Sequence, residues 1–438
     1  MNLDRTRAAV LGLGTSGEAA ARLLHQRGAN VTVFDSGSPN AQKVRTLQDL
    51  GILVITGEPA DMAKADYDLT ILSPGIDPVA PLVQNFRRQG ASLIGELELA
   101  FRFCQRPVIA ITGTNGKTTT TQLIESMLNA TGHRTVACGN IGMPFAEAVL
   151  RQGEFDIFTV EVSSFQLETI STFRPDVAVW LNLTPDHLDR YPNMAEYRTA
   201  KLRIFENQKS SDYAVTNYAD HLPGLIARQT TFSAYSKEAD FFLQGDTIRF
   251  RGEQILELKE TQLCGIHNAE NLMAALGTAQ AINIPWEKAK YGLKDYRLLP
   301  HRCEQVGEID GVVFINDSKA TNLDALVKAL DSQLKPVVLI VGGKDKGFEF
   351  DSIAGLVHDK AKHAVLIGEM ADRIFQSWSK VVPCSCAKTL PAAVEEARQR
   401  SLPGDVVLFS PGTSSFDMFK NYADRGNQFR EIVQELAR

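Results

Sequence analysis

The stretch Pro107-Val-Ile-Ala-Ile-Thr112 runs directly into Gly113-Thr-Asn-Gly-Lys-Thr118. The first six residues predict a buried parallel strand, and the next six predict a glycine loop that opens a helix near Lys117. Such a loop favours phosphate, because glycines let backbone N–H groups approach an anion and the helix N-terminus adds its positive dipole end. Lys117 adds a full positive charge, and the Thr118 hydroxyl is a ligand type for Mg²⁺. The stretch therefore predicts a nucleoside triphosphate site.

The spacing of this loop departs from the general phosphate-loop pattern. The chain reads Gly-x-x-Gly-Lys-Thr, two residues shorter than Gly-x4-Gly-Lys-Ser/Thr, and Ile111 stands where the first glycine would be. An ordinary strand-to-helix turn with a surface lysine therefore stays open as an alternative.

Length and charge limit the classes of function. The chain has 438 residues, which is too long for one hydrophobic core and indicates roughly two to four domains. It carries 46 Lys and Arg against 52 Asp and Glu, a net charge of −6. This balance argues against a nucleic-acid partner or an anionic membrane, although local basic pockets for phosphates remain compatible with it. We expect small-molecule substrates and a monomer.

Cysteine usage and hydropathy indicate the compartment. The cysteines are scattered, and only Cys384 and Cys386 are close together, without a second pair or a nearby histidine. This pattern indicates reduced thiols rather than a metal site. The chain shows no charged-then-apolar leader, and no apolar run approaches the ~20 residues that span a bilayer. The sequence therefore predicts a cytoplasmic protein without membrane insertion.

Short runs rich in Val, Ile and Leu alternate with helix-like segments, which is the β-α-β rhythm of parallel sheets. Alternating runs between 229 and 258 predict a small antiparallel sheet, followed by a helix from Ala269. The expected parallel strands are 7–13, 30–35, 53–56, 68–73, 107–112, 134–138, 156–162, 176–183, 213–217, 312–316, 336–341, 363–367 and 405–410.

This rhythm divides into three domains, residues 1–93, 94–298 and 299–438. The first boundary lies where a helix near Ile94 precedes the next sheet, and the second lies near 298–300. The predicted class is α/β, with Rossmann-like N-terminal and C-terminal domains. Between them we expect a P-loop ATPase-like parallel sheet that also carries the small antiparallel sheet.

A second glycine motif, Gly12-Leu-Gly-Thr-Ser-Gly17, follows the first strand, and Asp35 ends the next one. This matches the dinucleotide fingerprint, so an NAD-dependent oxidoreductase is the main rival interpretation. The motif requires only a diphosphate on the helix N-terminus and a polar group held by Asp35, and a UDP-linked substrate satisfies both. Ser73-Pro-Gly75, after a later strand, lies where open α/β sheets place ligands. Helix packing without a ligand would also explain the glycines.

Acidic and histidine side chains follow two strands after the phosphate loop. Glu161 ends the strand 156–162, where an oxygen ligand for Mg²⁺ is needed, although a solvated strand-end charge is the simpler alternative. His187 follows the next strand and is crowded by Asp186, Asp189 and Arg190, which favours a site role over a purely structural one.

Six motifs, taken in order, resemble the Mur ligase family over the whole chain. They are Gly113-Thr-Asn-Gly-Lys-Thr118, Gly139-Asn-Ile-Gly142, Glu161-Val-Ser-Ser-Phe-Gln-Leu-Glu168, Asp186-His-Leu-Asp-Arg190, Leu299-Pro-His-Arg302 and Asn316-Asp-Ser-Lys-Ala-Thr-Asn322. The run at 163–167 and the run at 410–417 resemble the member that adds D-glutamate. Folylpolyglutamate synthetases share the central and last domains, but they start near the phosphate loop, whereas about a hundred residues precede it here.

The resemblance implies an ADP-forming ligase of peptidoglycan precursor synthesis, and hence a role in cell shape and division, that joins D-glutamate to UDP-N-acetylmuramoyl-L-alanine. It places ATP on Gly113, Thr114, Asn115, Gly116, Lys117, Thr118, Asn268, Asn271, Arg302 and Asp317. It places the UDP substrate on Gly14, Thr15, Ser16, Asp35, Ser73, Gly75, Asn140, Ser163 and Gln166. It places D-glutamate on Lys319, Thr321, Lys346, Ser415 and Tyr422. Lys344 is an alternative to Lys346, and contacts at Tyr422 are expected to be packing or backbone contacts.

The implied chemistry phosphorylates the alanyl carboxylate with ATP, and the D-glutamate amine then attacks the acyl phosphate. The resemblance assigns catalytic roles to Lys117, His187, Lys201 and Lys319, with Arg302 helping to neutralise charge. Two Mg²⁺ ions are implied, with ligands among Thr118, Glu161, His187 and a carbamylated Lys201. From the residues alone, the basic positions of the helix 194–205, Lys201 among them, are most simply a solvated face. A non-catalytic nucleotide sensor stays open as a third class of function.

Overall fold

The computed structural model describes residues 3–188, 190–263, 265–297, 300–333 and 335–437. It divides into two compact units: the first contains Met1–Leu183 and Ala195–Tyr296, and the second contains Thr184–Met194 and Arg297–Arg438. The boundary predicted between Leu298 and Leu299 lies outside the described residues, as does Asp189. The described residues form two sheets in the first unit and one in the second, which confirms the predicted three-domain α/β class.

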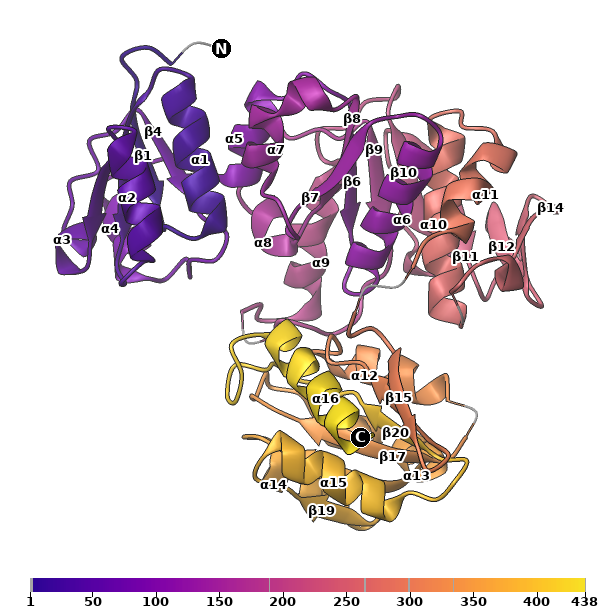
Figure 1. Cartoon of the computed structure of the whole chain (residues 1–438). Helices are drawn as coiled ribbons and strands as arrows, with labels where there is room; N and C mark the ends of the chain where they lie inside the picture. The colour runs from indigo at the N-terminus through magenta and orange to yellow at the C-terminus, as the bar shows by residue number, and fades with distance from the viewer. Residues whose placement is uncertain (1–2, 189, 264, 298–299, 334, 438) are drawn as a thin grey trace. The chain divides into compact units, whose positions relative to one another are not determined.

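The N-terminal sheet of the first unit pairs its strands in parallel, in the order β3-β2-β1-β4-β5. Its strands β1 and β4 are labelled in Figure 1. β1 lies at the centre because its residues 8–11 are apolar and fully buried. The order reverses between β1 and β4, so the loops after these two strands meet where open sheets bind ligands. The bounds are β1 (Arg7–Leu11), α1 (Thr15–Gln26), β2 (Asn30–Asp35), α2 (Ala41–Asp49), β3 (Leu53–Thr56), α3 (Glu58–Asp61), β4 (Leu69–Leu72), α4 (Pro81–Arg88), β5 (Leu93–Gly95) and α5 (Glu96–Phe103).

The central sheet of the first unit has the order β14-β13-β12-β11-β10-β9-β6-β8-β7. β6 lies between β9 and β8, and each of its five residues is buried, as expected for an inner parallel strand. The bounds are β6 (Val108–Thr112), α6 (Lys117–Ala130), β7 (Thr135–Gly139), α7 (Phe145–Leu150), η1 (Gln152–Glu154), β8 (Ile157–Glu161), α8 (Ser164–Leu167), β9 (Val177–Trp180), α9 (Met194–Leu202), η2 (Arg203–Phe205), β10 (Tyr213–Asn217), η3 (Tyr218–Asp220) and β11 (Arg228–Ser233).

The predicted antiparallel strands are present, but they do not form a separate sheet. β12 (Phe241–Gln244), β13 (Thr247–Phe250) and β14 (Glu253–Glu257) pair antiparallel with one another, whereas β11 pairs parallel with both β10 and β12. Gly245 (φ 58°) and Gly252 (φ 96°) supply the left-handed positions that the two tight hairpin turns require. The hairpins therefore extend the edge of the central sheet. They are followed by η4 (Leu258–Glu260), α10 (Ile266–Ala281) and α11 (Trp286–Lys294).

The second unit contains a sheet of order β15-β16-β20-β17-β18-β19, parallel except for the β15–β16 pair. Val337, Leu339 and Val341 of β17 pack with α12–α14, while Val338 and Ile340 pack with α15 and α16, so helices cover both faces. No helix among the described residues is long and apolar enough to cross a bilayer. The bounds are β15 (Glu304–Ile309), β16 (Val312–Asn316), α12 (Leu323–Asp331), β17 (Val337–Gly342), η5 (Phe350–Ile353), α13 (Ala354–Lys360), β18 (Ala361–Ile367), α14 (Ala371–Trp378), β19 (Cys384–Cys386), α15 (Leu390–Arg400), β20 (Val406–Phe409) and α16 (Tyr422–Leu436).

Two buried glutamates hold α5 against the rest of the first unit. Glu98 accepts hydrogen bonds from the backbone N–H groups of residues 171–173 and from Arg102 Nε at 2.9 Å. Glu96 accepts one bond, from Ala146 N at 2.5 Å, and its Oε2 has no partner among the described residues. Burial raises the pKa of Glu96 to about 7. Burial also acts upward on the pKa of Glu98, but the hydrogen bonds outweigh it and the net shift is downward.

The two glutamates are expected to affect stability with opposite dependence on pH. Because the pKa of Glu96 is raised on folding, the free energy of unfolding falls by up to ~3 kcal/mol as pH rises from about 4.5 to 7. Glu96→Gln should therefore gain stability over wild type at pH 8 and lose that gain near pH 4.5. Glu98→Gln, the control on the same helix, should be less stable than wild type at pH 8, with a deficit that shrinks in acid. Thermal unfolding at several pH values tests this, and a wild-type pH slope in Glu96→Gln would contradict it.

Candidate active site

The glycine loop predicted between β6 and α6 is present. Gly113 (φ 152°) and Gly116 (φ 83°) adopt backbone conformations that L side chains rarely reach. A Cβ on Gly116 would lie 2.4 Å from Asn271 Oδ1, so a side chain is also excluded by contact. α6 begins at Lys117, as predicted, and backbone N–H groups at its first turn face the loop. The shortened spacing is thus compatible with a phosphate-type loop.

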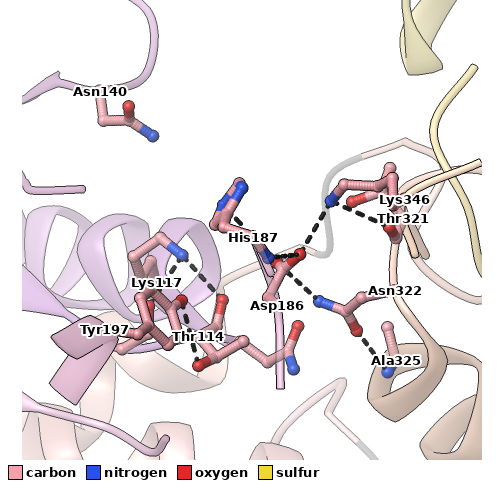
Figure 2. Close-up of polar contacts among 12 residues, drawn as sticks. Thr114, Lys117, Asn140, Asp186, His187, Tyr197, Thr321, Asn322, Ala325 and Lys346 are labelled. Atoms are coloured by element: carbon pink, nitrogen blue, oxygen red, sulfur yellow. Dashed lines mark hydrogen bonds and ion pairs between the residues drawn. The ribbon is translucent and has the colours of Figure 1, made fainter. Parts of the chain in front are cut away.

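The Lys117 side chain folds back over this loop. Its Nζ donates to Gly113 O at 2.9 Å and to Thr114 O at 2.7 Å (Figure 2). The loop is fixed from the other side by Asn182, whose Oδ1 accepts from Asn115 N at 2.9 Å and whose Nδ2 donates to Asn115 O at 3.0 Å. Lys117 is therefore not a freely solvated surface lysine. Asn182 supports the loop although it was not among the predicted site residues.

The two asparagines predicted to bind ATP lie on α10 next to α6. Asn271 Oδ1 accepts from Thr120 Oγ1 at 3.1 Å, and Asn271 Nδ2 donates to Asn268 Oδ1 at 3.2 Å. Both asparagine side chains are buried. The structure thus brings Asn268 and Asn271 to the start of the phosphate-loop helix.

Glu161 is buried at the end of β8, which excludes the solvated strand-end alternative. The residue is 2% exposed, and its Oε1 accepts from Asn140 Nδ2 at 2.8 Å. Its Oε2 is buried without a hydrogen-bond partner among the described residues. A buried carboxylate oxygen left unpaired is costly, and a divalent cation that prefers oxygen ligands would satisfy it. Glu161 therefore fits the predicted Mg²⁺ role, and Asn140, which was predicted to bind the UDP substrate, lies in contact with it.

The basic residues of α9 and η2 are not a solvated face, and that interpretation was wrong. Lys201 is 1% exposed; its Nζ donates to Gly113 O at 2.8 Å and lies 4.8 Å from the centroid of the Tyr197 ring. Arg203 donates to the carbonyls of residues 168 and 170, and Arg198 donates to the carbonyl of Asp220. The helical spacing is that of a surface helix, but its basic side chains donate to backbone carbonyls of neighbouring loops and of η3. Lys201 thereby contacts the phosphate loop.

Two other predicted residues have a local structural role. Ser163 and Gln166 form the capping box of α8, in which Gln166 Oε1 accepts from Ser163 N at 3.0 Å. Their side chains are therefore fixed near the carboxyl end of β8, next to Glu161. A contact with a substrate would have to share these hydrogen bonds.

The first glycine motif is a tight strand-to-helix turn. A Cβ on Gly17 would lie 1.8 Å from Gly12 O, so this glycine is needed for close packing of α1 on β1. Gly14 precedes α1 without a side-chain cap, which leaves the backbone N–H groups of the first turn, at Thr15 and Ser16, available. Ser73 is buried at the neighbouring loop after β4, and Gly75 follows it. Packing and ligand binding thus both account for the glycines.

Asp35 organises this turn. Its Oδ2 accepts from Leu13 N at 2.7 Å, and its Oδ1 accepts from Gly37 N at 2.8 Å. A single carboxylate therefore links the loop after β1 to the loop after β2.

The segment 184–194, which carries His187, groups with the second unit. His187 has φ 55°, and its carbonyl accepts from Arg190 N and Tyr191 N, so the residue starts a tight turn. Asp186 accepts from His187 N at 2.9 Å and from Lys346 Nζ at 2.8 Å. Among the described residues, no group of three or more His, Cys, Asp and Glu side chains is arranged to hold a metal ion.

Residues predicted to bind ATP and D-glutamate lie at the carboxyl ends of β16, β17 and β20. Asp317 is buried, and its Oδ2 accepts from Ser410 Oγ at 2.8 Å; burial raises the pKa of Asp317 to about 6, although nearby Arg302 acts in the opposite direction. Lys319 Nζ lies 3.9 Å from the centroid of the Tyr422 ring, a cation–π contact. The Tyr422 carbonyl also accepts from Ser318 Oγ at 2.8 Å.

The buried Arg425 connects the loops that carry these residues. It donates to Ser318 O at 2.8 Å and to Thr413 O at 3.3 Å, and burial lowers its pKa to about 10. These bonds join the loop of Lys319 and Thr321 to the loop of Ser415. Ser318 and Thr413 lie in the sequence motifs described above, whereas Arg425 does not. Long-range pairing of this kind has no signal in a single sequence.

Comparisons with known proteins agree along the chain. The Mur ligase MurD-like N-terminal domain matches residues 6–95, the Mur ligase middle domain matches 111–279, and the Mur ligase glutamate ligase domain matches 301–412. A UDP-N-acetylmuramoylalanine--D-glutamate ligase of Koribacter versatilis is 41% identical over 450 residues, covering 100% of this chain and 99% of that protein. The protein of the same name from Geotalea uraniireducens is 43% identical over 448 residues, with coverages of 100% and 99%.

Solved structures show the same fold at lower identity. The UDP-N-acetylmuramate-alanine ligase MurC of Thermotoga maritima has a TM-score of 0.64 at 20% identity and covers 98% of this chain and 100% of its own. The MurF ligase of the same organism, in complex with ADP, has a TM-score of 0.61 at 16% identity, with coverages of 84% and 95%. Because relatives at about 40% identity extend over both chains almost completely, this chain belongs to the Mur ligase family.

Proposed function

We propose that this protein is an ATP-dependent, ADP-forming ligase that adds D-glutamate to UDP-N-acetylmuramoyl-L-alanine in peptidoglycan precursor synthesis. The observation that carries the proposal is the glycine loop of residues 113–118, with Lys117 folded over it, in a chain whose full-length relatives bear that name. We assign residues 1–93 to the UDP substrate, 94–298 to ATP and 299–438 to the amino acid. We also propose that the protein acts as a monomer in the cytoplasm.

Binding of ATP is assigned to the phosphate loop and to α10. Lys117 moves from its two backbone carbonyls to the β- and γ-phosphates, and the backbone N–H groups of the loop bind phosphate oxygens. The buried Asn268 and Asn271 supply amide groups beside the same helix. The assigned ATP residues are Gly113, Thr114, Asn115, Gly116, Lys117, Thr118, Asn268, Asn271, Arg302 and Asp317.

Two Mg²⁺ ions are proposed, with ligands among Thr118, Glu161, His187 and a carbamylated Lys201. The unpaired Oε2 of Glu161 and the burial of Lys201 against Gly113 O support this set. When bound, Mg²⁺ neutralises charge on the phosphate oxygens during phosphoryl transfer. Lys201 is at present an N–H donor, and conversion to a carbamate would turn it into an oxygen ligand.

The remaining residues position the two substrates. The UDP substrate is assigned to Gly14, Thr15, Ser16, Asp35, Ser73, Gly75, Asn140, Ser163 and Gln166, and D-glutamate to Lys319, Thr321, Lys346, Ser415 and Tyr422. Two carboxylates need cations and hydroxyl or backbone donors, and Lys319 and Lys346 supply the cations. Lys344 is more exposed and pairs through its backbone N–H with Ser414 O, which favours Lys346.

The chain's own groups stabilise the charge that develops in the reaction. A free carboxylate is a poor acyl donor, so ATP first phosphorylates the alanyl carboxylate, with Lys117 and Arg302 binding phosphate oxygens. The D-glutamate amine then attacks the acyl carbon, and phosphate leaves. Lys319 binds developing negative charge in this second step.

Turnover of ATP by the purified protein tests this function. ADP is expected to form only when UDP-N-acetylmuramoyl-L-alanine and D-glutamate are both present. With ¹⁸O in the alanyl carboxylate, the label should appear in the released phosphate, because the acyl-phosphate route transfers that oxygen. Unlabelled phosphate would contradict the mechanism, and ADP formation that ignores D-glutamate would contradict the assigned acceptor.

Asp35→Ala is expected to weaken binding of the UDP substrate roughly tenfold and to leave ATP affinity unchanged. The reason is that its carboxylate holds the backbone of Leu13 and Gly37 and so fixes the loop after β1. Asp35→Asn keeps one acceptor and should lose less. Calorimetry measures both affinities, and NADH should not bind the wild-type protein. Micromolar NADH binding that the UDP substrate does not compete would support an oxidoreductase instead.

A further inference from the structure

One buried carboxylate in the second unit joins three loops, two of which carry predicted glutamate-binding residues. Asp186 is 6% exposed; its Oδ1 accepts from Lys346 Nζ at 2.8 Å, and its Oδ2 accepts from Asn322 Nδ2 at 3.1 Å (Figure 2). Asp186 comes from the segment 184–194, whereas the other two residues follow β16 and β17. Segments distant in sequence therefore meet on this side chain.

Lys346 is held in one orientation by this contact. Its side chain is only 14% exposed, its Nζ lies 3.5 Å from Thr321 O, and the Phe348 ring centroid is 5.5 Å away. An ammonium has three N–H donors, of which Asp186 binds one and Thr321 O lies at the distance limit for a second. Among the described residues Lys346 Nζ makes no third hydrogen bond, which leaves one N–H for another acceptor beside Thr321.

The same carboxylate also fixes the loop of Thr321. Asn322 is the N-cap of α12, and its Oδ1 accepts from Ala325 N at 2.9 Å while its Nδ2 donates to Asp186. The residue before the cap, Thr321, is thereby held at the start of a helix. Asp186 thus sets the position of Lys346 relative to Thr321, and both are among the residues assigned to D-glutamate.

Asp186 orients the Lys346 side chain and does not itself attract a carboxylate of the substrate. Its Oδ1 forms an ion pair with Lys346 Nζ at 2.8 Å, and both side chains are largely buried. An incoming anion therefore meets an ammonium whose charge is already balanced. If charge were decisive, removing Asp186 would tighten binding of a carboxylate. If position is decisive, removing it would weaken that binding.

We propose that Asp186 is a positioning residue for the amino-acid substrate, which holds the Lys346 ammonium beside Thr321 so that one N–H points at a carboxylate of D-glutamate. The proposal rests on the proposed function, in which Lys346 and Thr321 bind that substrate. Without Asp186, Lys346 regains rotamer freedom that each binding event must remove again. Removing Asp186 is therefore expected to raise the KM for D-glutamate and to leave the KM for ATP unchanged.

Steady-state kinetics on the full chain test this, using Asp186→Asn, Lys346→Ala and the double variant. Asp186→Asn should raise the KM for D-glutamate roughly tenfold. Each binding event would then have to immobilise the long Lys346 side chain, and the lost side-chain entropy weakens binding by about that factor. The KM for ATP should stay at the wild-type value. The double variant should match Lys346→Ala alone, because Asp186 acts through Lys346.

A matched control comes from the same unit. Asp405 is also 6% exposed, and its carboxylate accepts from Lys362 Nζ and from Leu402 N at 2.6 Å, but none of these residues is assigned to a substrate. Asp405→Asn therefore loses a comparable buried ion pair. It should lower the temperature of unfolding without changing the KM for D-glutamate.

The outcomes separate this inference from the proposed function. A KM for D-glutamate in Asp186→Asn at or below wild type overturns the positioning role, and so does a double variant whose KM is the product of the two single effects. A wild-type KM in Lys346→Ala overturns the assignment of Lys346 as well. Wild-type protein that forms ADP without D-glutamate overturns the proposed function itself.

Discussion

Lys117→Ala is expected to lower turnover by about 10³-fold or more while the variant still binds UDP-N-acetylmuramoyl-L-alanine almost as tightly as wild type. The ammonium acts on the transferred phosphoryl group, where charge builds up in the transition state. In the structure it bonds to Gly113 O and Thr114 O, so it already lies over the loop that we propose binds the phosphates. The loss should therefore appear in the chemical step and in ATP affinity.

The fold is expected to survive this change because the loop has other supports. Gly113 O keeps its bond from Lys201 Nζ at 2.8 Å, and Asn182 keeps both of its bonds to Asn115. Lys117→Arg is the control: it retains the charge but places it in a fork of different geometry, so it should recover only part of the activity. Single-turnover ADP formation and calorimetry with the UDP substrate measure the two effects. Equal loss of turnover and of UDP-substrate binding would show that Lys117 is structural.

The sequence predicted the glycine loop between β6 and α6 correctly because its determinants are local. A fully buried strand, two glycines that take left-handed or related conformations, and a lysine at the first helical position all lie within residues 107–118. Backbone geometry and helix dipole then follow from neighbouring residues alone. The same holds for the inner strands β1, β6 and β17, which are buried on both faces apart from Arg7 and consist mostly of apolar residues.

Edge strands were harder to predict because they are partly exposed and do not form continuous apolar runs. β15 (Glu304–Ile309) carries glutamates and pairs antiparallel at the edge of its sheet, and β19 (Cys384–Cys386) is short and partly exposed. Neither shows the apolar run of a buried parallel strand. The antiparallel hairpins after β11 were detected, but their attachment to the central sheet depends on pairing between β11 and β12, which has no local signal.

Side-chain burial within the site was predicted least well. Glu161 and Lys201 each allowed a solvated interpretation, yet they are 2% and 1% exposed. Asp186 was named only as a neighbour of His187, although it bonds to Lys346 across 160 positions of sequence. Such contacts depend on how loops at the carboxyl ends of parallel strands meet, which spacing within one motif does not encode.

Lys201→Ala is expected to lower activity by about 10²-fold or more, and a short carboxylic acid such as acetate or formate should restore part of it. The side chain is buried, with Nζ on Gly113 O and over the Tyr197 ring, so its removal leaves a small space next to the phosphate loop. If Lys201 acts as a carbamate, the missing group is an anion that supplies oxygen ligands. Added acetate would occupy that space and supply the oxygens.

The alternative role, an ammonium that only donates a hydrogen bond to Gly113 O, gives the opposite pattern of rescue. A short amine such as methylamine would then restore the donor, whereas acetate would bring a carboxylate up to a carbonyl oxygen and would not help. Formation of the carbamate requires capture of CO₂ by a neutral amine. Wild-type activity should therefore fall in CO₂-depleted buffer and recover with bicarbonate, while the activity of Lys201→Ala should ignore bicarbonate. Rescue by methylamine, or wild-type turnover in Lys201→Ala without CO₂, would show that the carbamate assignment is wrong.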